Sequence, residues 1–285
     1  MKKYLSILPF LLFSGFLLSR ATMAASPLQT EISAGYTYDD NVTRAEFDND
    51  IEKDSIINLD ASARYNIPFN DISYFSLKGT LEINQYLEYD KLSNTRLGIR
   101  GSYHFRPFTG YTATRFFALA AYERRFYDSE QRDGSATYLQ LGLNKRLTDS
   151  VTLFAGYIKE DIDANHIVFD ADNDRLYLDL DFRLTTNNTL YTTFGYLDGD
   201  LVTTARSGIG IVYDYWVIDD AFTELSPTRW AYKQTGKAVT IRIGDNYAFA
   251  SNQAVDGSLL YYDSQSDAGG KYSGLILNLN YLYRF

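Results

Sequence analysis

Hydrophobic and polar residues alternate along much of the chain with a period of two, and the pattern is clearest in the last segment. Leu275, Leu277 and Leu279 share one face of that segment, while Asn278 and Asn280 fall on the other. Successive side chains of a β-strand point to opposite faces, so the segment is predicted to be a strand with one apolar and one polar face. A membrane-spanning barrel needs this arrangement, because its outer face meets lipid and its inner face lines a polar lumen.

The same alternation recurs in further segments, with many charged residues in the polar phase. A polar lumen explains those charges better than the half-buried sheet of a soluble protein does. The predicted strands cover residues 29–38, 55–67, 73–89, 95–106, 112–127, 136–147, 151–160, 174–184, 189–198, 231–245, 254–263 and 273–285. The predicted fold class is therefore all-β, an antiparallel transmembrane barrel of about 12 strands, an even number as in other single-chain bacterial barrels.

The segment between residues 198 and 229 leaves two strand counts open. Residues 207–218 are apolar and β-branched enough to form an extra strand, and residues 229–234 would then pair back across a turn at residues 235–237. That interpretation gives about 14 strands. The preferred interpretation is one long loop, in which residues 219–225 form a short helix.

Connections between the predicted strands come in two lengths, which sets the expected orientation. Outer-membrane barrels have short periplasmic turns and long extracellular loops, so both ends of the barrel are predicted to be periplasmic. The short connections lie near residues 68–71, 107–110, 148–150, 185–188 and 250–253, and the longer ones cover residues 39–54, 90–94, 128–134, 161–173, 198–229 and 264–271.

The first residues of the chain have a different pattern. Lys2 and Lys3 precede an apolar stretch over residues 4–18, and Ala24 is a small residue suited to cleavage. This is the pattern of a secretory signal peptide, and the stretch is short for a membrane-spanning helix. The predicted organisation is a signal peptide at residues 1–24 and one outer-membrane barrel domain at residues 25–285, since a barrel closes only when every strand is present.

Composition and charge narrow the classes of function. Residues 1–24 hold three of the 27 Lys and Arg and none of the 36 Asp and Glu, so the remainder carries 24 positive and 36 negative residues, a formal charge of −12. Such a surface does not suit nucleic acid, which is not expected as a partner. The chain has no Cys, which removes disulfides and thiolate metal sites from consideration.

The last strand ends on aromatic residues in its apolar phase, Tyr281, Tyr283 and Phe285. An alternating C-terminal strand that ends in Phe resembles the targeting signal of bacterial outer-membrane barrel proteins. The resemblance covers about a dozen residues. It implies an outer-membrane location, with the barrel assembly machinery, periplasmic chaperones, membrane lipid and lipopolysaccharide as partners. It implies no activity.

Candidate catalytic and metal-binding chemistry is sparse. The chain has two histidines, His104 and His166, and neither shows a recognisable spacing to a nucleophile. No catalytic residue, metal site or cofactor is therefore predicted. The acidic residues between positions 39 and 54 carry oxygen ligands of the kind that Ca²⁺ prefers, but they lack a spaced loop motif with a glycine turn. They are interpreted as a solvated exterior surface.

Charged residues in the lumen-facing phase are the main functional candidates. Arginine at several heights would line a path for anionic solutes, because the guanidinium fork binds carboxylate and phosphate well. Paired with lumen acids, the same arginines would instead form salt bridges that fill a narrow lumen. The predicted lumen-lining residues are Arg64, Arg96, Arg100, His104, Arg106, Arg115, Arg125, Arg175, Arg183, Arg242, Lys78, Glu82, Asp179 and Asp181.

Aromatic residues have two interpretations. Those at strand ends are typical of the girdles that mark both membrane interfaces. Those on the lumen side or in loops are candidates for stacking against sugars; they are Tyr86, Tyr177, Trp216 and Trp230.

The leading hypothesis is a porin-like channel, not an enzyme, for small hydrophilic solutes, with anionic solutes and oligosaccharides as candidates. Barrels of about 12 strands that pass acidic sugars have an arginine-lined lumen, and this chain is similar in that feature. The alternative is a closed structural, assembly or surface-polysaccharide-associated barrel that acts through its long loops. Residues 35–42, GYTYDDNV, resemble the first strand of barrels associated with exopolysaccharide export or surface-lipoprotein assembly. An outer-membrane hydrolase ranks third.

Overall fold

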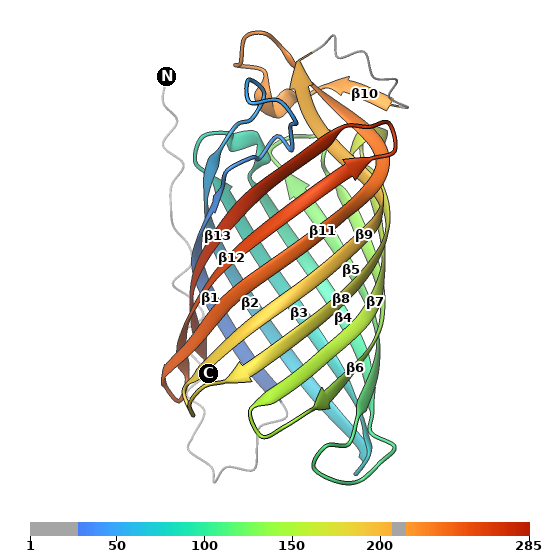
Figure 1. Cartoon of the computed structure of the whole chain (residues 1–285), viewed down its shortest axis with the longest axis vertical. Coiled ribbons are helices and arrows are strands. Elements are labelled where there is room, and N and C mark those ends of the chain that lie inside the picture. Colours follow the sequence, from blue (N-terminus) through green and yellow to red (C-terminus); the bar gives the residue numbers. More distant parts are fainter. Residues whose placement is uncertain (1–27, 207–214) are drawn as a thin grey trace.

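The computed structural model describes residues 28–206 and 215–285, which form a closed antiparallel β-barrel (Figure 1). Two pairings between strands that are not consecutive in the chain make the ring continuous: β1 pairs with β13, and β9 pairs with β11. Closure leaves no free strand edge in the wall, which a bilayer demands because lipid offers no hydrogen-bonding partners. The twelve strands of the ring are β1 (Leu28–Asp39), β2 (Asp54–Asn70), β3 (Ser73–Tyr86), β4 (Asn94–Phe105), β5 (Arg115–Tyr127), β6 (Gly134–Arg146), β7 (Val151–Ala164), β8 (Ala171–Arg183), β9 (Asn188–Arg206), β11 (Arg229–Ala250), β12 (Gln253–Ser266) and β13 (Lys271–Arg284).

The uncertain segment after residue 198 is resolved in favour of twelve ring strands. Strand β9 continues to Arg206 and pairs with the start of β11, so the predicted loop boundary at residue 198 was wrong. The turn at residues 235–237, which belonged to the 14-strand alternative, is absent, because β11 runs through these residues without a break as the predicted strand at residues 231–245 does. A short strand, β10 (Tyr215–Ile218), pairs only with β11 beyond the ring. Residues 207–214 of the alternative strand lie outside the described residues.

The two faces of the wall differ as the alternation predicted. Leu275, Leu277 and Leu279 of β13 are 42–53 % exposed on the outside. Asn278, on the opposite face, accepts a hydrogen bond inside the barrel from the Thr37 hydroxyl. This much exposed apolar surface would make a water-soluble protein aggregate, whereas lipid covers it at no cost.

The connections divide the barrel into two ends. At the short-turn end, β2 and β3 are joined by residues 71–72 and β11 and β12 by residues 251–252. At the opposite end, called the long-loop end, residues 40–53 join β1 to β2 and residues 207–228 join β9 to β11. Most other long-loop connections are shorter than predicted because the strands extend further, whereas the β4–β5 connection at the short-turn end is longer and spans residues 106–114.

In the part of the chain that the structure describes, helical structure is limited to three single turns of 3₁₀ helix: η1 (Asp90–Leu92), η2 (Ile167–Phe169) and η3 (Asp220–Phe222). The third confirms the short helix predicted within residues 219–225. Within residues 28–206 and 215–285, no helix is long and apolar enough to cross a membrane. The predicted signal peptide, residues 1–24, lies outside the described residues and stays a prediction.

Gly134 is a position where close strand packing leaves no room for a side chain. A Cβ atom there would lie 2.1 Å from the carbonyl oxygen of Asp163 and 2.8 Å from Cα of Ala164, both backbone atoms. We expect Gly134→Ala to lower the free energy of unfolding by about 1–3 kcal/mol, the usual cost of overpacking. Urea unfolding of the refolded barrel in lipid vesicles measures this.

Gly79 provides the matched control, since a Cβ there meets nothing within 4 Å. Gly79→Ala should leave the unfolding midpoint nearly unchanged. If the two variants unfold at the same urea concentration, the close approach at Gly134 does not limit stability.

Candidate functional site

The lumen contains a large cavity near the short-turn end, which we call the chamber. Its volume is about 1000 Å³, and its lining comes mainly from β2 to β8. Seven of the fourteen predicted lumen residues line it: Arg64, Lys78, Arg100, His104, Arg106, Arg115 and Asp179. A cavity of this size holds a solute of one or two sugar rings.

Three cations form a row across adjacent strands of the chamber wall. In the strand register, Arg64 lies opposite Lys78, and Lys78 lies opposite Arg100. Like charges directly opposite each other destabilise a sheet, so the row is not explained by stability. In the described parts of the chain, no carboxylate lies within ion-pair distance of these three side chains.

The charge of the whole chamber is positive. Arg106 and Arg115 add two further cations to the row of three, whereas the lining contributes only two acids, Asp71 and Asp179. Five positive groups and two negative groups give a formal excess of three positive charges. A concave surface of one sign focuses the electric field and raises the local concentration of counter-ions, here anions.

His104 lies at the centre of an aromatic and polar cluster in the chamber. Its ring stacks on Tyr74, with ring centres 4.4 Å apart and planes 9° apart. Its Nε2 atom lies 3.0 Å from the hydroxyl oxygen of Ser102, so the structure brings together a hydroxyl and an imidazole that the sequence spacing did not single out. Hydrolytic triads also need an acid on the second ring nitrogen, and none of the described residues supplies one.

Above the chamber, charged side chains of β2 to β5 form what we call the polar belt. Glu82 lies opposite both Asp60 and Arg96 in the strand register. Nε of Arg125 donates to Oε1 of Glu123 at 2.7 Å, whereas Arg96 donates to Asn94 at 2.9 Å and to no carboxylate among the described residues. The belt therefore mixes paired and unpaired charge.

The remaining predicted lumen residues lie outside the chamber. Arg175 is bound to Glu160 at 2.5 Å, which supports the salt-bridge interpretation for this arginine. Asp181 faces Thr152 and Tyr191 across the strands. Arg183 ends β8 at the short turn, and Arg242 of β11 lies opposite Thr193 of β9.

The long-loop end is closed by two segments, residues 40–53 and 219–225, which we call the cap. Asn41 and Thr43 are almost completely buried, and the backbone oxygen of Thr43 accepts a hydrogen bond from the Thr204 backbone nitrogen at 2.7 Å. The Arg44 guanidinium donates to Asp39 at 2.7 and 2.8 Å and to the hydroxyl of Tyr262 at 2.8 Å. The β1–β2 connection is therefore folded against strands from the far part of the chain.

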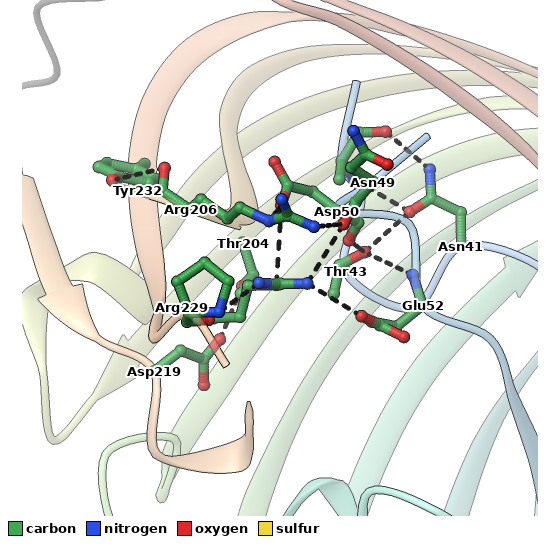
Figure 2. Close-up of polar contacts among 12 residues, drawn as sticks. Asn41, Thr43, Asn49, Asp50, Glu52, Thr204, Arg206, Asp219, Arg229 and Tyr232 are labelled. Carbon is green, nitrogen blue, oxygen red and sulfur yellow. Dashed lines mark hydrogen bonds and ion pairs between the residues drawn. The ribbon is translucent and has the colours of Figure 1, made fainter. Parts of the chain in front are cut away.

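Four charged residues fasten the cap, and we call them the latch: Asp50, Glu52, Arg206 and Arg229 (Figure 2). Nε of Arg206 lies 2.9 Å from Oδ1 of Asp50. Nη2 of Arg229 donates to Oε1 of Glu52 at 3.1 Å, and its Nε lies 3.8 Å from Asp50. The side chains of Arg229 and Asp50 are only 4 % and 5 % exposed, so water screens their interaction weakly.

The second cap segment spans the mouth of the barrel. Phe222 packs on Tyr89 with ring centres 4.6 Å apart. These residues belong to the β9–β11 and β3–β4 connections, which have six strands between them in either direction around the ring. Asp219, fully buried, accepts from Arg132 of the β5–β6 connection at 2.8 Å. The cap thus joins opposite sides of the long-loop end.

Two groups at the long-loop end, Arg44 of the cap and Tyr89 beside it, have shifted pKa values. Burial disfavours the charged Arg44 guanidinium, but the Asp39 carboxylate outweighs burial, and the pKa of Arg44 is raised. Burial, and then the hydrogen bond to Glu52, raise the pKa of Tyr89. Both groups therefore keep their ordinary charge states, Arg44 cationic and Tyr89 neutral, throughout the physiological pH range.

The acidic loop is the main correction to the sequence analysis. The residues between positions 39 and 54 were interpreted as a solvated surface, yet Asp39, Asp50 and Asp54 are 3–4 % exposed. Asp50 is paired with arginines, and Asp54 accepts backbone hydrogen bonds from residues 87–89. Among the described residues, no cluster of three or more His, Asp or Glu side chains is arranged to hold a metal ion. His166 is a loop residue whose Nδ1 accepts from the Val168 backbone nitrogen at 3.3 Å.

Comparison with known proteins identifies the fold. Neither a scan against protein-family models nor a search of curated proteins found a match. Among solved structures, an outer-membrane channel from Pseudomonas putida F1 aligns with a TM-score of 0.62 at 10% sequence identity, over 90% of this chain and 95% of that chain. The chain has the fold of a bacterial outer-membrane β-barrel.

More distant structures also align over most of the barrel. The translocator domain of the autotransporter NalP from Neisseria meningitidis gives a TM-score of 0.44 at 12% identity, over 90% of this chain and 88% of that one. OmpT of Vibrio cholerae gives 0.43 at 9% identity, over 90% and 97%. At these identities the likeness concerns the fold alone, so the function of this barrel has to be argued from its own lumen.

Proposed function

We propose that this protein is a porin-like channel of the bacterial outer membrane that admits small anionic, hydrophilic solutes. The observation that carries the proposal is the chamber, where Arg64, Lys78 and Arg100 face the lumen without carboxylate partners. A barrel stabilised by lumen salt bridges would pair these cations. Twelve strands also enclose more space than the eight whose interior side chains can fill.

The cap acts as the gate of the proposed channel. In our proposal the short-turn end faces the periplasm and the cap faces the exterior, as in barrels with short periplasmic turns. A cavity of about 250 Å³ lies directly beneath the cap, lined in part by Arg44, Arg125 and Arg132. Solute would pass from the exterior through this cavity and the polar belt to the chamber once the cap has moved.

Single-channel recording in a planar bilayer tests the proposal, with a salt gradient to read ion selectivity. The informative variant replaces residues 40–53 by Asn-Gly; Asp39 and Asp54 are paired across the two strands, so a two-residue hairpin turn fits there. We expect rare openings from the complete barrel and steady, anion-preferring conductance from the variant. A folded variant that stays silent at every voltage would overturn the proposal.

A second candidate is a closed barrel that acts through its long-loop end. The dense packing of the cap supports it, because Phe222 and Asp219 fill the mouth almost without exposure. The same variant discriminates the two: a silent barrel that has lost attachment to surface polysaccharide or to a surface protein favours the second candidate. The role of Tyr281, Tyr283 and Phe285 as an assembly signal stays a prediction in either case.

A further inference from the structure

Two aromatic rings of the chamber wall pack against glycine residues of neighbouring strands. A Cβ atom added to Gly142 would lie 2.4 Å from Cζ of Phe117, and one added to Gly156 would lie 2.7 Å from the hydroxyl oxygen of Tyr177. Each ring fills the space that a side chain would take. Both rings also line the chamber, so a ligand held there can contact them. An aromatic face of this kind attracts the weakly positive CH groups of a ring laid on it.

The aromatic faces lie close to the chamber cations. Phe117 and His104 are opposite each other on β5 and β4, with ring centres 5.8 Å apart. His104 stacks on Tyr74, and the guanidinium carbon of Arg115 lies 5.8 Å from the centre of the Tyr74 ring. Arg115 and Phe117 are two residues apart on the same face of β5, about 7 Å along the strand, so a ligand that stacks on Phe117 has a cation within about the length of one sugar ring.

Amide and hydroxyl groups complete the chamber lining. The amide of Gln140 donates to the Tyr177 hydroxyl at 2.7 Å, which fixes the orientation of that ring. Amides both donate and accept hydrogen bonds, as the hydroxyl groups of a sugar require. The other amide side chains of the lining are Gln29, Asn66, Asn70 and Asn144.

We propose that the chamber binds a sugar acid, in which a six-membered ring stacks on Phe117 and its carboxylate meets Arg115. This proposal rests on the proposed function, since it names the solute class of the same lumen. It excludes neutral sugars, which leave the cations without a counter-ion. It also excludes open-chain acids, which leave the aromatic faces uncovered.

Isothermal titration calorimetry on the detergent-refolded barrel tests binding without requiring conductance. The probes are glucuronate, gluconate as an open-chain acid of the same charge and nearly the same size, glucose as a neutral ring, and benzoate as a flat acid without hydroxyl groups. We expect glucuronate to bind at least about tenfold more tightly than gluconate, glucose or benzoate, the ratio that one aromatic stacking contact supplies.

Two substitutions separate the ring contact from the charge. Phe117→Leu should weaken glucuronate binding about tenfold and leave gluconate binding unchanged. Tyr177→Phe keeps the ring and loses only the hydrogen bond to Gln140, so its effect should be smaller. Gel migration of unheated samples verifies that each variant is a folded barrel, and Phe117→Met replaces Phe117→Leu if the latter does not fold.

The outcomes separate this proposal from the channel itself. Equal affinities for glucuronate and gluconate would overturn it, because the ring would contribute nothing. Tighter binding of benzoate than of glucuronate would overturn it in favour of an aromatic acid. Glucuronate binding by a barrel that never conducts would support the site while removing the channel. Conductance without selective binding would keep the channel and remove the site.

Discussion

Replacing Arg229 by Met is expected to release the cap and raise the open probability of the proposed channel by about 100-fold or more. The substitution leaves the carboxylates of Asp50 and Glu52 in place without one of their two cations, and Asp50 is only 5 % exposed. Removing one partner of a buried ion pair costs about 3–5 kcal/mol, and each 1.4 kcal/mol is a factor of ten in an equilibrium. Single-channel recording measures the open probability, and limited proteolysis of residues 40–53 reports cap release independently.

The control for this prediction lies on the same strand. Lys237 of β11 is 58 % exposed and only 4.0 Å from Asp198, an exposed pair that contributes little. Lys237→Met should behave like the unaltered barrel. Adding Glu52→Gln to Arg229→Met should restore closure in part, because Asp50 keeps Arg206 as its partner and no carboxylate of the latch then lacks a cation. Equal conductance and protease resistance in Arg229→Met and Lys237→Met would show that the latch does not hold the cap.

Reversing two chamber charges is expected to turn the proposed channel from anion-preferring to cation-preferring. The double variant Lys78→Glu with Arg100→Glu changes the formal charge of the chamber by minus four, from an excess of three positive charges to one negative charge. Counter-ion concentration in a narrow, low-dielectric lumen follows the sign of its walls. The reversal potential in a salt gradient should therefore change sign.

A control with the same change in total charge is available on exposed positions. Lys237 and Lys271 both lie on the solvent-accessible outer surface near the long-loop end. Lys237→Glu with Lys271→Glu should leave the sign of the reversal potential unchanged. If both double variants shift the reversal potential equally, the ion selectivity arises from the overall electric field of the protein and not from the chamber.

Strand positions and faces were predictable from the sequence because they depend on a local pattern. The period of two in residues 273–285 fixes which side chains face lipid, and the structure places that strand at Lys271–Arg284. The turn that the 14-strand alternative placed at residues 235–237 is absent for a physical reason. Gly236 is a residue that turns often contain, but a Cβ there would lie 2.5 Å from the backbone oxygen of Gln265. This glycine permits close strand packing and makes no turn.

The cap was not predictable because its contacts join residues far apart in the chain. The sequence shows acids between positions 39 and 54 and arginines at 206 and 229, and nothing local indicates that they meet. The lumen position of the aromatic residues of the chamber could have been predicted from the sequence. Phe117 shares the parity of Arg115, which was assigned to the lumen, so the same rule places its ring inside.

The long-range latch also sets an order of events during assembly. Arg206 and Arg229 contact the β1–β2 connection across 157 and 180 residues of chain. The segment that seals the mouth is thus made early in synthesis, whereas Arg206 and Arg229 belong to β9 and β11, which reach β1 only when β12 and β13 have followed and β13 pairs with β1. A barrel that has not yet closed therefore has an unsealed mouth, and sealing marks the completion of the wall. The latch can therefore form only after every strand of the ring is in place.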